Sequence, residues 1–378
     1  MKILSTLLLL SSLFIQAKSQ SNITKSFMFD GLTRDYIIHL PTGYSTATKY
    51  PIVFNLHGYT SNAIQEQFYS KMDIVSNTDP ERFIIVYPNG VANAWNSWTA
   101  SGVDDVGFIS ELIDSMNAQY NVDLNRVYSC GMSNGGFQSY RLACELSNRI
   151  VAIASVTGSM SSYVYSNCNP SRPVPVLEIH GTADATVPYA GQAGMESIDQ
   201  VIQFWQEHNA CGISDTTAVA NISTTDNCTV DEIKFNDCDN GSKTWLFKVW
   251  DGGHSWPDAA IDLMGLNTNR DINASQEIWD FFKQFTMFSS VNVPILESNK
   301  TSISLAPNPS NDILNISLAH PFQRIVLSDM MGNIKLVTPI DNTLDFTLSL
   351  KSLSNGMYHL QFLNSDNTSE SRRVIVIH

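Results

Sequence analysis

The chain has 378 residues, 43% of them hydrophobic and 15% charged, a composition typical of a globular protein with a sizeable core. This length suffices for one domain of ordinary size and a smaller second one. The formal net charge is −14 at pH 7. Because an acidic surface repels polyanions, the charge argues against nucleic acid and anionic membranes as partners and favours a neutral or weakly charged substrate.

Residues 1–19 have the pattern of a secretory signal peptide. Lys2 supplies a short positive region, residues 3–15 are mostly apolar, and Ala17-Lys18-Ser19 is a small-x-small cleavage site. A retained anchor helix is the alternative, but the apolar stretch is short for a membrane span. No later stretch is long and apolar enough to cross a bilayer, so we expect a soluble, exported mature protein.

Residues 20–285 are expected to form one domain, in which the pattern alternates between strands and helices from residue 24 to about 285. Runs rich in Val, Ile and aromatic residues predict strands at 35–40, 52–56, 83–87, 126–130, 151–156, 174–179 and 244–250. Apolar residues at helical spacing predict helices at 104–120, after Ser133, at 198–208 and at 273–285. This alternation predicts an α/β fold with a mostly parallel central sheet that helices cover on both faces.

The pattern changes near residue 286. Residues 286–300 have no clear period and are expected to form a linker. Short strand patterns then follow at 313–318, 325–327, 334–337, 344–348, 357–362 and 374–377. The polar run 364–373 predicts a loop, and we find no helix pattern. Residues 301–378 are therefore expected to form a small all-β sandwich.

The chain has six cysteines, and export would permit disulfides. Their spacing matches no zinc pattern and contains no C-x-x-C motif, and the sequence alone cannot choose their pairing. Cys211, Cys228 and Cys238 lie in one polar segment, which favours a bridge within that trio. Cys130 and Cys144 have apolar neighbours and are expected to be inert core residues.

The segment Gly131-Met132-Ser133-Asn134-Gly135 matches the G-x-S-x-G pattern of a nucleophile elbow. The pattern alone is weak, and a simple Gly-Ser loop is the alternative. Here it follows a predicted strand and opens a predicted helix. A turn this tight strains the serine and exposes its hydroxyl at the carboxyl end of the sheet, while the glycines avoid clashes. This context predicts Ser133 as a nucleophile.

A serine hydroxyl needs a base to take its proton. In the α/β-hydrolase fold the acid and then the histidine follow the serine along the chain, which excludes His39 and His57. Asp184 and His254 each follow a predicted strand, so both are expected at the sheet edge that carries Ser133. The weaker candidates, which lack so clear a setting or are expected to be structural, are His180, His208, Asp226, Asp231 and Asp251.

An acyl-transfer site also needs N–H donors for the oxyanion. The backbone N–H of Asn134, next after the serine, is the expected first donor. The second is expected in the loop after the strand at 52–56, from the backbone N–H of Tyr59.

Tryptophans gather in the predicted loops at the same edge. Trp95, Trp98 and Trp256 could form an apolar wall that binds a substrate. Packing within the loops is the alternative, and the sequence favours neither.

Six motifs, in order, resemble one known family: LHGY at 56–59, VYPNG at 86–90, DDVGF at 104–108, GMSNGG at 131–136, HGTADATVPY at 180–189 and GGHSWP at 252–257. Residues 25–285 resemble the secreted polyhydroxybutyrate-depolymerase-like esterases, a family that includes feruloyl and acetyl-xylan esterases. The resemblance implies an α/β-hydrolase fold and the triad Ser133, Asp184 and His254. Many members have a cysteine where this chain has Tyr59, so no disulfide is inferred for that loop.

The C-terminal region resembles the sorting domain of the type IX secretion system. The motifs that carry the resemblance are Ala306-Pro307-Asn308-Pro309, Met331-Gly332, the segment at 353–358 and Arg372-Arg373 before an apolar end. The resemblance implies export across the outer membrane, to the medium or the cell surface. A carbohydrate- or polymer-binding module is the alternative, but no row of exposed aromatic residues is evident for stacking.

The sequence therefore predicts a secreted serine esterase that hydrolyses carboxylic esters through an acyl-enzyme. The expected substrate is a polymeric or oligomeric ester of the hydroxybutyrate, feruloyl or acetyl type, and no metal or organic cofactor is implied. A peptidase of the same fold and an inactive polymer-binding protein are the alternatives, since a triad also cuts amides and fold alone does not fix function.

Overall fold

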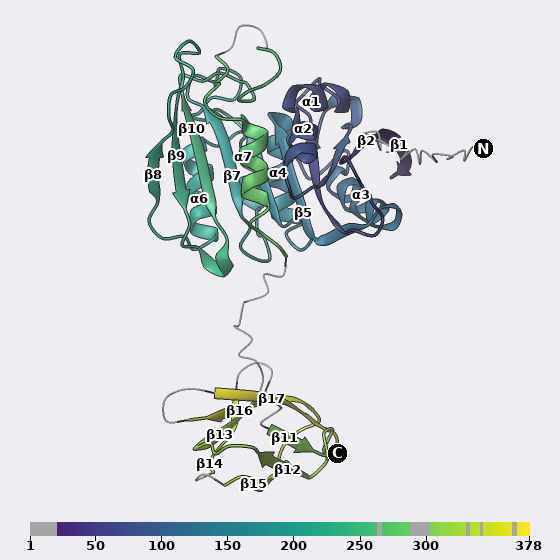
Figure 1. The fold of residues 1–378 in the computed structure, drawn as a ribbon, viewed down its shortest axis with the longest axis vertical. Coiled ribbons are helices and arrows are strands. Elements are labelled where there is room, and N and C mark those ends of the chain that lie inside the picture. The colour runs from purple at the N-terminus through teal and green to yellow at the C-terminus, as the bar shows by residue number, and fades with distance from the viewer. Residues whose placement is uncertain (1–20, 263–266, 288–302, 330–332, 341–342, 365–368) are drawn as a thin grey trace, which may run out of the picture. The chain divides into compact units, whose positions relative to one another are not determined.

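The computed structural model describes residues 21–262, 267–287, 303–329, 333–340, 343–364 and 369–378 (Figure 1). The chain divides into two compact units, Met1–Ser289 and Ser290–His378. Each unit is described by itself. The predicted signal peptide and most of the predicted linker lie outside the described residues.

A ten-stranded sheet forms the centre of the first unit, in the order β1-β2-β4-β3-β5-β6-β7-β10-β9-β8. Six neighbouring strands run parallel, namely β4, β3, β5, β6, β7 and β10. Antiparallel strands extend the sheet at both edges, β2 and β1 beyond β4, and β9 and β8 beyond β10. The strands are β1 (Ser21–Phe29), β2 (Leu32–Leu40), β3 (Tyr50–Leu56), β4 (Ile84–Pro88), β5 (Val122–Met132), β6 (Ala152–Val156), β7 (Val176–Gly181), β8 (Asp215–Ala218), β9 (Thr229–Phe235) and β10 (Thr244–Trp250).

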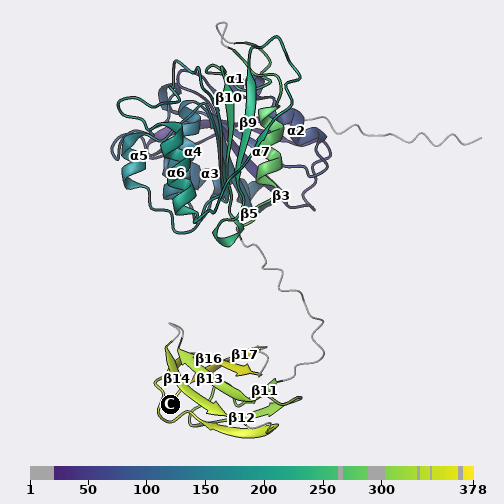
Figure 2. The same ribbon diagram turned by 90° about the vertical axis from the view of Figure 1, so that its left-hand side faces the viewer.

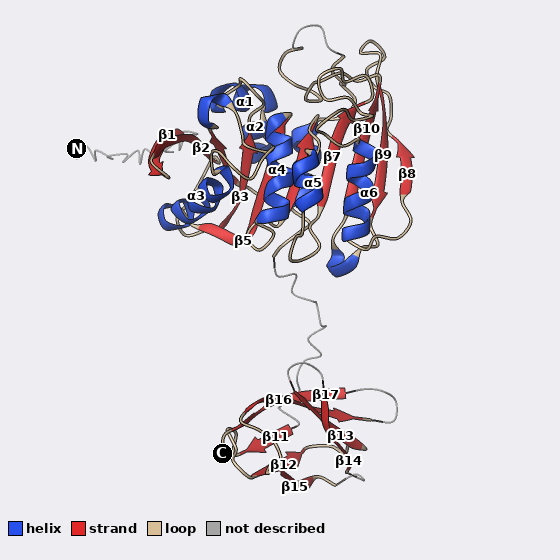
Figure 3. Ribbon diagram, turned by 180° about the vertical axis from the view of Figure 1, so that it is seen from behind, coloured by secondary structure: helices blue, strands red, loops and turns tan. Residues whose placement is uncertain are grey.

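Helices cover both faces of this sheet, as Figure 2 shows with the strands seen nearly edge-on. One face carries α3, α4, α5 and α6, and the other carries α1, α2 and α7. Figure 3 shows α4 and α6 lying against the strands. The helices are α1 (Ala63–Ser70), α2 (Met72–Thr78), α3 (Asp105–Gln119), α4 (Asn134–Glu145), α5 (Ser162–Asn167), α6 (Ile198–His208) and α7 (Ala274–Phe282).

The core has two layers because successive strand residues point to opposite faces. In β4, Ile85 packs on the α1, α2 and α7 side, whereas Ile84 and Val86 pack on the α3, α4 and α6 side. A strand buried on both faces has no polar alternation, which explains the continuous apolar runs. The predicted α/β-hydrolase fold is confirmed.

The sequence analysis missed the elements with little apolar signal. It did not predict β1, β8 and β9, nor the short helices α1, α2 and α5. Strand β8 is exposed at every position, since it lies at the sheet edge where polar side chains face water. Backbone pairing with β9 holds it in place without any apolar pattern.

The second unit is a small antiparallel β-sandwich, as predicted. One sheet has the order β11-β12-β15 and the other β14-β13-β16-β17. The strands are β11 (Ile303–Ala306), β12 (Ile313–Leu318), β13 (Arg324–Asp329), β14 (Ile334–Pro339), β15 (Asp345–Ser349), β16 (Gly356–Leu363) and β17 (Ser369–Val376). Alternating residues of both sheets fill one core, among them Leu314, Ile316, Leu360 and Phe362.

One predicted loop of the second unit is wrong in part. Residues 369–373, within the polar run 364–373, belong to β17, which pairs with β16 from Ser369 to Val376. The ladder is formed by backbone groups, so a polar strand at the edge of a sheet gives no hydrophobic signal.

The structure also corrects one expectation about the cysteines. Cys144 is not a free core thiol, because it forms a disulfide with Cys168. Cys211 and Cys238 form the second disulfide, which confirms a bridge within the trio. Cys130 and Cys228 are buried and free.

Helix α1 buries a carboxyl group against the sheet. The Glu66 side chain is 2% exposed, and its Oε1 atom has no hydrogen-bond partner in the described part of the chain. Burial raises the pKa of Glu66 from 4.5 to about 8. The folded unit therefore holds this group protonated, and the stability that this provides is lost as the pH rises from about 4.5 towards 8.

We predict that Glu66→Gln stabilises the first unit at neutral pH. The variant removes the cost of keeping the acid protonated, so its advantage should be small near pH 4.5 and reach roughly 3 kcal/mol at pH 7. Urea unfolding followed by tryptophan fluorescence would measure this, since all 7 tryptophans belong to the first unit. An advantage that stays constant from pH 4.5 to 8 would contradict the prediction.

Candidate active site

Ser133 stands at the turn between β5 and α4, at the carboxyl end of the sheet. Its backbone has φ 53° and ψ −120°, a conformation that non-glycine residues rarely adopt. The Ser133 N–H donates to the carbonyl oxygen of Val156 at 2.9 Å, which fixes the turn on the next strand. This is the strained strand-to-helix geometry of a nucleophile elbow.

Glycine is required around Ser133 because the end of β3 packs directly on the elbow. A Cβ atom at Gly131 or at Gly135 would overlap with the carbonyl oxygen of Leu56. On the other side, a Cβ built on Gly58 would lie 3.5 Å from the Ser133 Cβ. The loop that follows β3 therefore flanks the nucleophile.

Asp184 and His254 come together from the loops after β7 and β10. The His254 Nδ1 atom lies 2.7 Å from Asp184 Oδ2. The other carboxylate oxygen, Oδ1, accepts the backbone N–H groups of Thr186 and Val187, both at 2.8 Å. A fixed carboxylate of this kind holds Nδ1 as the donor and leaves Nε2 of the imidazole to accept a proton.

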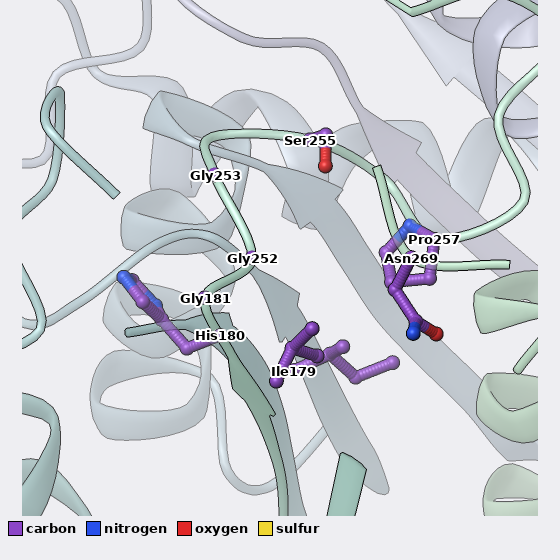
Figure 4. Close-up of a pocket in the computed structure, with 9 residues that line it drawn as sticks. Ile179, His180, Gly181, Gly252, Gly253, Ser255, Pro257 and Asn269 are labelled. Carbon is purple, nitrogen blue, oxygen red and sulfur yellow. The ribbon is translucent and has the colours of Figure 1, made fainter. Parts of the chain in front are cut away.

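Close backbone contact between the two loops produces this pairing. A Cβ at Gly181 would overlap with the carbonyl oxygen of Gly252, so the strand ends meet without side chains between them. The Ala183 N–H donates to that same Gly252 oxygen at 2.9 Å, and Asp251 N–H donates to Thr182 Oγ1 at 2.8 Å. Figure 4 shows the end of β7 beneath the turn at 252–255. A small cavity of about 10 Å³ is lined by residues of both segments.

The predicted residues are thus brought to one edge of the sheet, although one contact is not formed. Within the described residues, no hydrogen bond joins Ser133 Oγ to His254. In hydrolases without substrate this contact is often long and tightens when the substrate binds.

The other acids and histidines considered from the sequence have different partners. Asp226 accepts the Arg270 N–H, Asp231 accepts Trp250 Nε1, and His208 contacts the carbonyl oxygen of Arg172. His180 is buried between Glu178 and Val187. His39 and His57 are buried as well, and no hydrogen bond in the described chain joins any of these groups to Ser133.

Both predicted oxyanion donors belong to segments next to Ser133: Asn134 follows it in the chain, and Tyr59 follows Gly58, where a built Cβ would lie 3.5 Å from the Ser133 Cβ. No hydrogen bond from either N–H to an acceptor is found in the described part of the chain. His57 fixes the Tyr59 loop: its Nδ1 donates to Gly58 O at 2.7 Å and its Nε2 accepts the Gly90 N–H at 2.9 Å. Burial lowers the pKa of His57, consistent with a neutral imidazole in this role.

The predicted tryptophan wall is wrong for two of its three members. Trp95 is 2% exposed and Trp256 is 1% exposed, because both side chains pack in the core. The indole N–H of Trp95 donates to His57 O, and that of Trp256 donates to Ser275 Oγ. Trp98 is 39% exposed and packs on Phe137 of α4, four residues after Ser133. Only Trp98 remains a candidate for substrate contact.

The Asn134 side chain holds the tryptophan loop on the elbow, a role that the sequence analysis did not identify. Its Oδ1 accepts the Trp95 N–H at 2.7 Å, and its Nδ2 donates to Trp95 O and Ser97 Oγ, both at 3.1 Å. The amide can satisfy both backbone groups of Trp95 because asparagine carries a donor and an acceptor.

A polar pocket lies beside the Tyr59 loop, and its shape could not be foreseen from the sequence. It has a volume of about 370 Å³. The residues that line it are Leu32, Thr33, Arg34, Asp35, Asn62, Asn89, Gly90, Val91, Ala92 and Asn93. A hydrogen bond of 2.8 Å from Thr60 N–H to Asn93 O joins its lining to the loop that flanks Ser133.

Two family models match the chain. Residues 34–187 match the model described as esterase PHB depolymerase, and residues 304–377 match the secretion system C-terminal sorting domain. The second match confirms that the protein is exported, to the extracellular space or to the cell surface. In the described residues no helix is long and apolar enough to cross a membrane.

Curated relatives of the first unit are esterases. The chain is 30% identical over 227 residues to "Probable feruloyl esterase C" of Aspergillus clavatus, covering 58% of this chain and 75% of that protein. It is 27% identical over 281 residues to the bifunctional acetylxylan esterase/xylanase XynS20E of Neocallimastix patriciarum, covering 74% and 37%. It is 26% identical over 270 residues to feruloyl esterase B of Piromyces equi, covering 67% of this chain and 46% of that protein. The chain spans less than half the length of the last two relatives.

A solved structure shares the fold. The acetyl xylan esterase from Aspergillus awamori matches with a TM-score of 0.51 and 14% identity, covering 69% of this chain and 99% of that chain. At this identity the likeness supports the fold alone.

We predict that Asn134→Ala destabilises the first unit by about 2 kcal/mol. The variant keeps the backbone N–H of residue 134 but leaves the buried Trp95 N–H without its acceptor, and it removes one of the two hydrogen bonds to Trp95 O, which also accepts the Ser97 N–H. Urea unfolding followed by tryptophan fluorescence measures the loss, and Asn167→Ala, at an exposed position of α5, serves as the control. Equal stability of the two variants would argue against the anchoring role.

Proposed function

The chain belongs to the esterase family of the feruloyl esterases and PHB depolymerases, and from this we propose that its first unit is a serine esterase acting on acyl esters of plant polysaccharides. The observation that carries the proposal is the hydrogen bond between His254 and Asp184 at the sheet edge that also bears the strained Ser133. A nucleophile, a base and an acid in this order are the parts that acyl transfer requires.

In the proposed mechanism, Ser133 Oγ attacks the ester carbonyl carbon while His254 Nε2 takes the hydroxyl proton. Asp184 orients the imidazole and stabilises its protonated form. The tetrahedral intermediate collapses when His254 returns the proton to the leaving alcohol. Water, activated by the same histidine, then hydrolyses the acyl-enzyme and regenerates Ser133.

The backbone N–H groups of Asn134 and Tyr59 are proposed to hold the oxyanion. Each such donor contributes about 3–4 kcal/mol of transition-state stabilisation in well-studied hydrolases. Both are backbone groups, so the side chain at position 59 is free to vary. The Tyr59 side chain is indeed 69% exposed.

The polar pocket supports a sugar-bearing substrate. Three amide side chains line it, and two of them already bond within the protein: Asn62 Oδ1 accepts the Gln65 N–H, and the Asn89 amide bonds the Ala63 N–H and Asp35. The exposed Asn93 amide is therefore the best placed of the three to donate to and accept from hydroxyl groups. Trp98, which packs on Phe137 of α4, offers an exposed apolar surface for an acyl group. We therefore propose that the pocket holds carbohydrate and that Trp98 contacts the acyl group.

We further propose that the second unit recruits the type IX secretion machinery. The match to a secretion sorting domain supports this partner, together with the motifs at 306–309, 353–358 and 372–373. This is a role in export and requires nothing of the catalytic residues.

We predict that a fluorophosphonate probe labels the full chain at Ser133 and that His254→Ala prevents the labelling. Ser133→Ala should reduce ester hydrolysis by more than roughly a thousandfold, because the acyl-enzyme can no longer form. Mass spectrometry locates the adduct, and release of acetate or ferulate from xylan measures turnover. Cleavage of anilides in preference to esters would instead favour a peptidase, and no labelling of the folded protein would favour a binding protein.

We predict that Asn93→Gly raises the KM for an acetylated xylo-oligosaccharide about fivefold, the effect of losing one hydrogen bond of about 1 kcal/mol. Hydrolysis of 4-nitrophenyl acetate, which has no sugar, should not change. Glycine is the suitable replacement because Asn93 has φ 58°. Asn240→Gly is the matched control, since Asn240 is also exposed and has φ 54°. Equal effects on both substrates would argue against a sugar-binding pocket.

A further inference from the structure

A buried acid and a buried histidine lie behind Asp184, and the proposed mechanism does not use them. Glu178 and His180 are two residues apart on β7, so their side chains share one face of the sheet, and both are fully buried. His180 Nδ1 lies 3.0 Å from Glu178 Oε1. The Tyr140 hydroxyl of α4 donates to the other oxygen, Oε2, at 2.7 Å.

The second nitrogen of His180 faces the proposed catalytic acid. His180 Nε2 lies 2.8 Å from the carbonyl oxygen of Val187 and 3.5 Å from Asp184 Oδ2. A carbonyl oxygen can only accept, so Nε2 carries a proton. Asp184 Oδ2 is also the atom that contacts His254 Nδ1, so two imidazoles share one carboxylate oxygen.

The remaining proton of the pair can occupy either of two positions. Glu178 can hold it and donate to a neutral His180, or His180 can hold it as an imidazolium beside an ionised Glu178. In the second arrangement the positive ring lies between two carboxylates, Glu178 at 3.0 Å and Asp184 at 3.5 Å. The negative charge of Asp184 favours the second arrangement. At a buried site a carboxylate is attracted more strongly to a positively charged imidazolium than to a neutral imidazole.

We propose that His180 is an imidazolium clamped between Glu178 and Asp184, and that it acts as a positioning residue for the Asp184–His254 pair. It contacts the same Asp184 oxygen, Oδ2, that contacts His254, and its positive charge opposes protonation of His254. The inference rests on the proposed function, since it assigns His254 as the base.

The pKa directions agree with a retained proton. Burial raises the pKa of Glu178. Burial alone would lower the pKa of His180, but the hydrogen bond and charge of Glu178 outweigh it, so the pKa of His180 is raised. Both directions favour retention of the proton that the pair shares.

The groups that face the pair come from every neighbouring element. Tyr189 packs edge-on against the His180 ring, with centroids 6.0 Å apart, and its hydroxyl donates to Asp199. Lys248 of β10 is the register partner of His180, but its Nζ lies over the Tyr189 ring. The titratable or charged neighbours are Glu178, Asp184, Tyr140, Tyr189, Asp199, Lys248 and His254.

The test is the pH profile of kcat/KM for Glu178→Gln in the full chain. The glutamine amide can donate to a neutral His180 just as a protonated Glu178 would, so the shape of the site is preserved. If His180 is an imidazolium, the variant loses that positive charge together with the negative charge of Glu178. Because His180 is the member of the pair that contacts Asp184, the loss of its charge dominates, and the acid limb should move to higher pH. If the wild-type pair is neutral, the limb stays where it is, and the proposal is overturned.

Two further variants keep this test decisive. Tyr140→Phe removes only the hydroxyl that stabilises the Glu178 carboxylate, so it should move the acid limb in the same direction by less. Asp73→Asn is the matched control, because Asp73 interacts with another buried histidine, His39 of β2. The side chains of Asn22 and Asn77 form hydrogen bonds with the His39 ring. That variant should leave the limb unchanged, and a shift as large as that of Glu178→Gln would contradict the assignment to His180.

A second readout is independent of activity. In ¹⁵N-histidine NMR of the full chain, His180 should show protons on both ring nitrogens between pH 6 and pH 8. An unprotonated Nδ1 in that range would refute the imidazolium. If the protein hydrolyses no ester, the proposed function fails, but the NMR spectrum still decides the state of His180.

Discussion

The approach of the ends of β7 and β10, with no side chain between them, is the contact on which the candidate site depends. Gly181 and Gly252 touch through their backbones, and the parallel register pairs Val249 with Gly181, so both strands end at the same level. The acid loop can then donate the Ala183 N–H to Gly252. Any larger residue at Gly181 would separate Asp184 from His254, whatever its own chemistry.

The same kind of contact positions the nucleophile. Gly131 and Gly135 let the elbow approach the end of β3, and the loop after β3 then lies beside Ser133. His57 joins that loop to Gly90 after β4. Parallel strands present their carboxyl ends at one edge, so the loops after β3, β4, β5, β7 and β10 all reach the same region. The sheet thus supplies the common edge, and glycine supplies the close packing.

Buried charges occur around the site where geometry must be held. Arg34 pairs with Asp105 at 2.6 Å with both side chains buried, and Asp105 also accepts the Asn96 N–H of the tryptophan loop. A buried ion pair adds little net stability compared with apolar packing, but removing one partner is costly. Such a pair therefore fixes a conformation more than it strengthens the fold. The Glu178–His180 pair has the same character behind Asp184.

The sequence by itself determined the α/β alternation, the elbow at Ser133, the strand-end positions of Asp184 and His254 and the all-β character of the tail. These features depend on local periodicity and turn chemistry, which neighbouring residues encode. Only the tertiary structure decided that Trp95 and Trp256 are buried, that Cys144 pairs with Cys168, that polar segments form β8 and β17, and that His180 contacts Asp184. Each of these depends on which distant segments pack together, and the type of a residue does not identify the residues that it contacts in the folded protein.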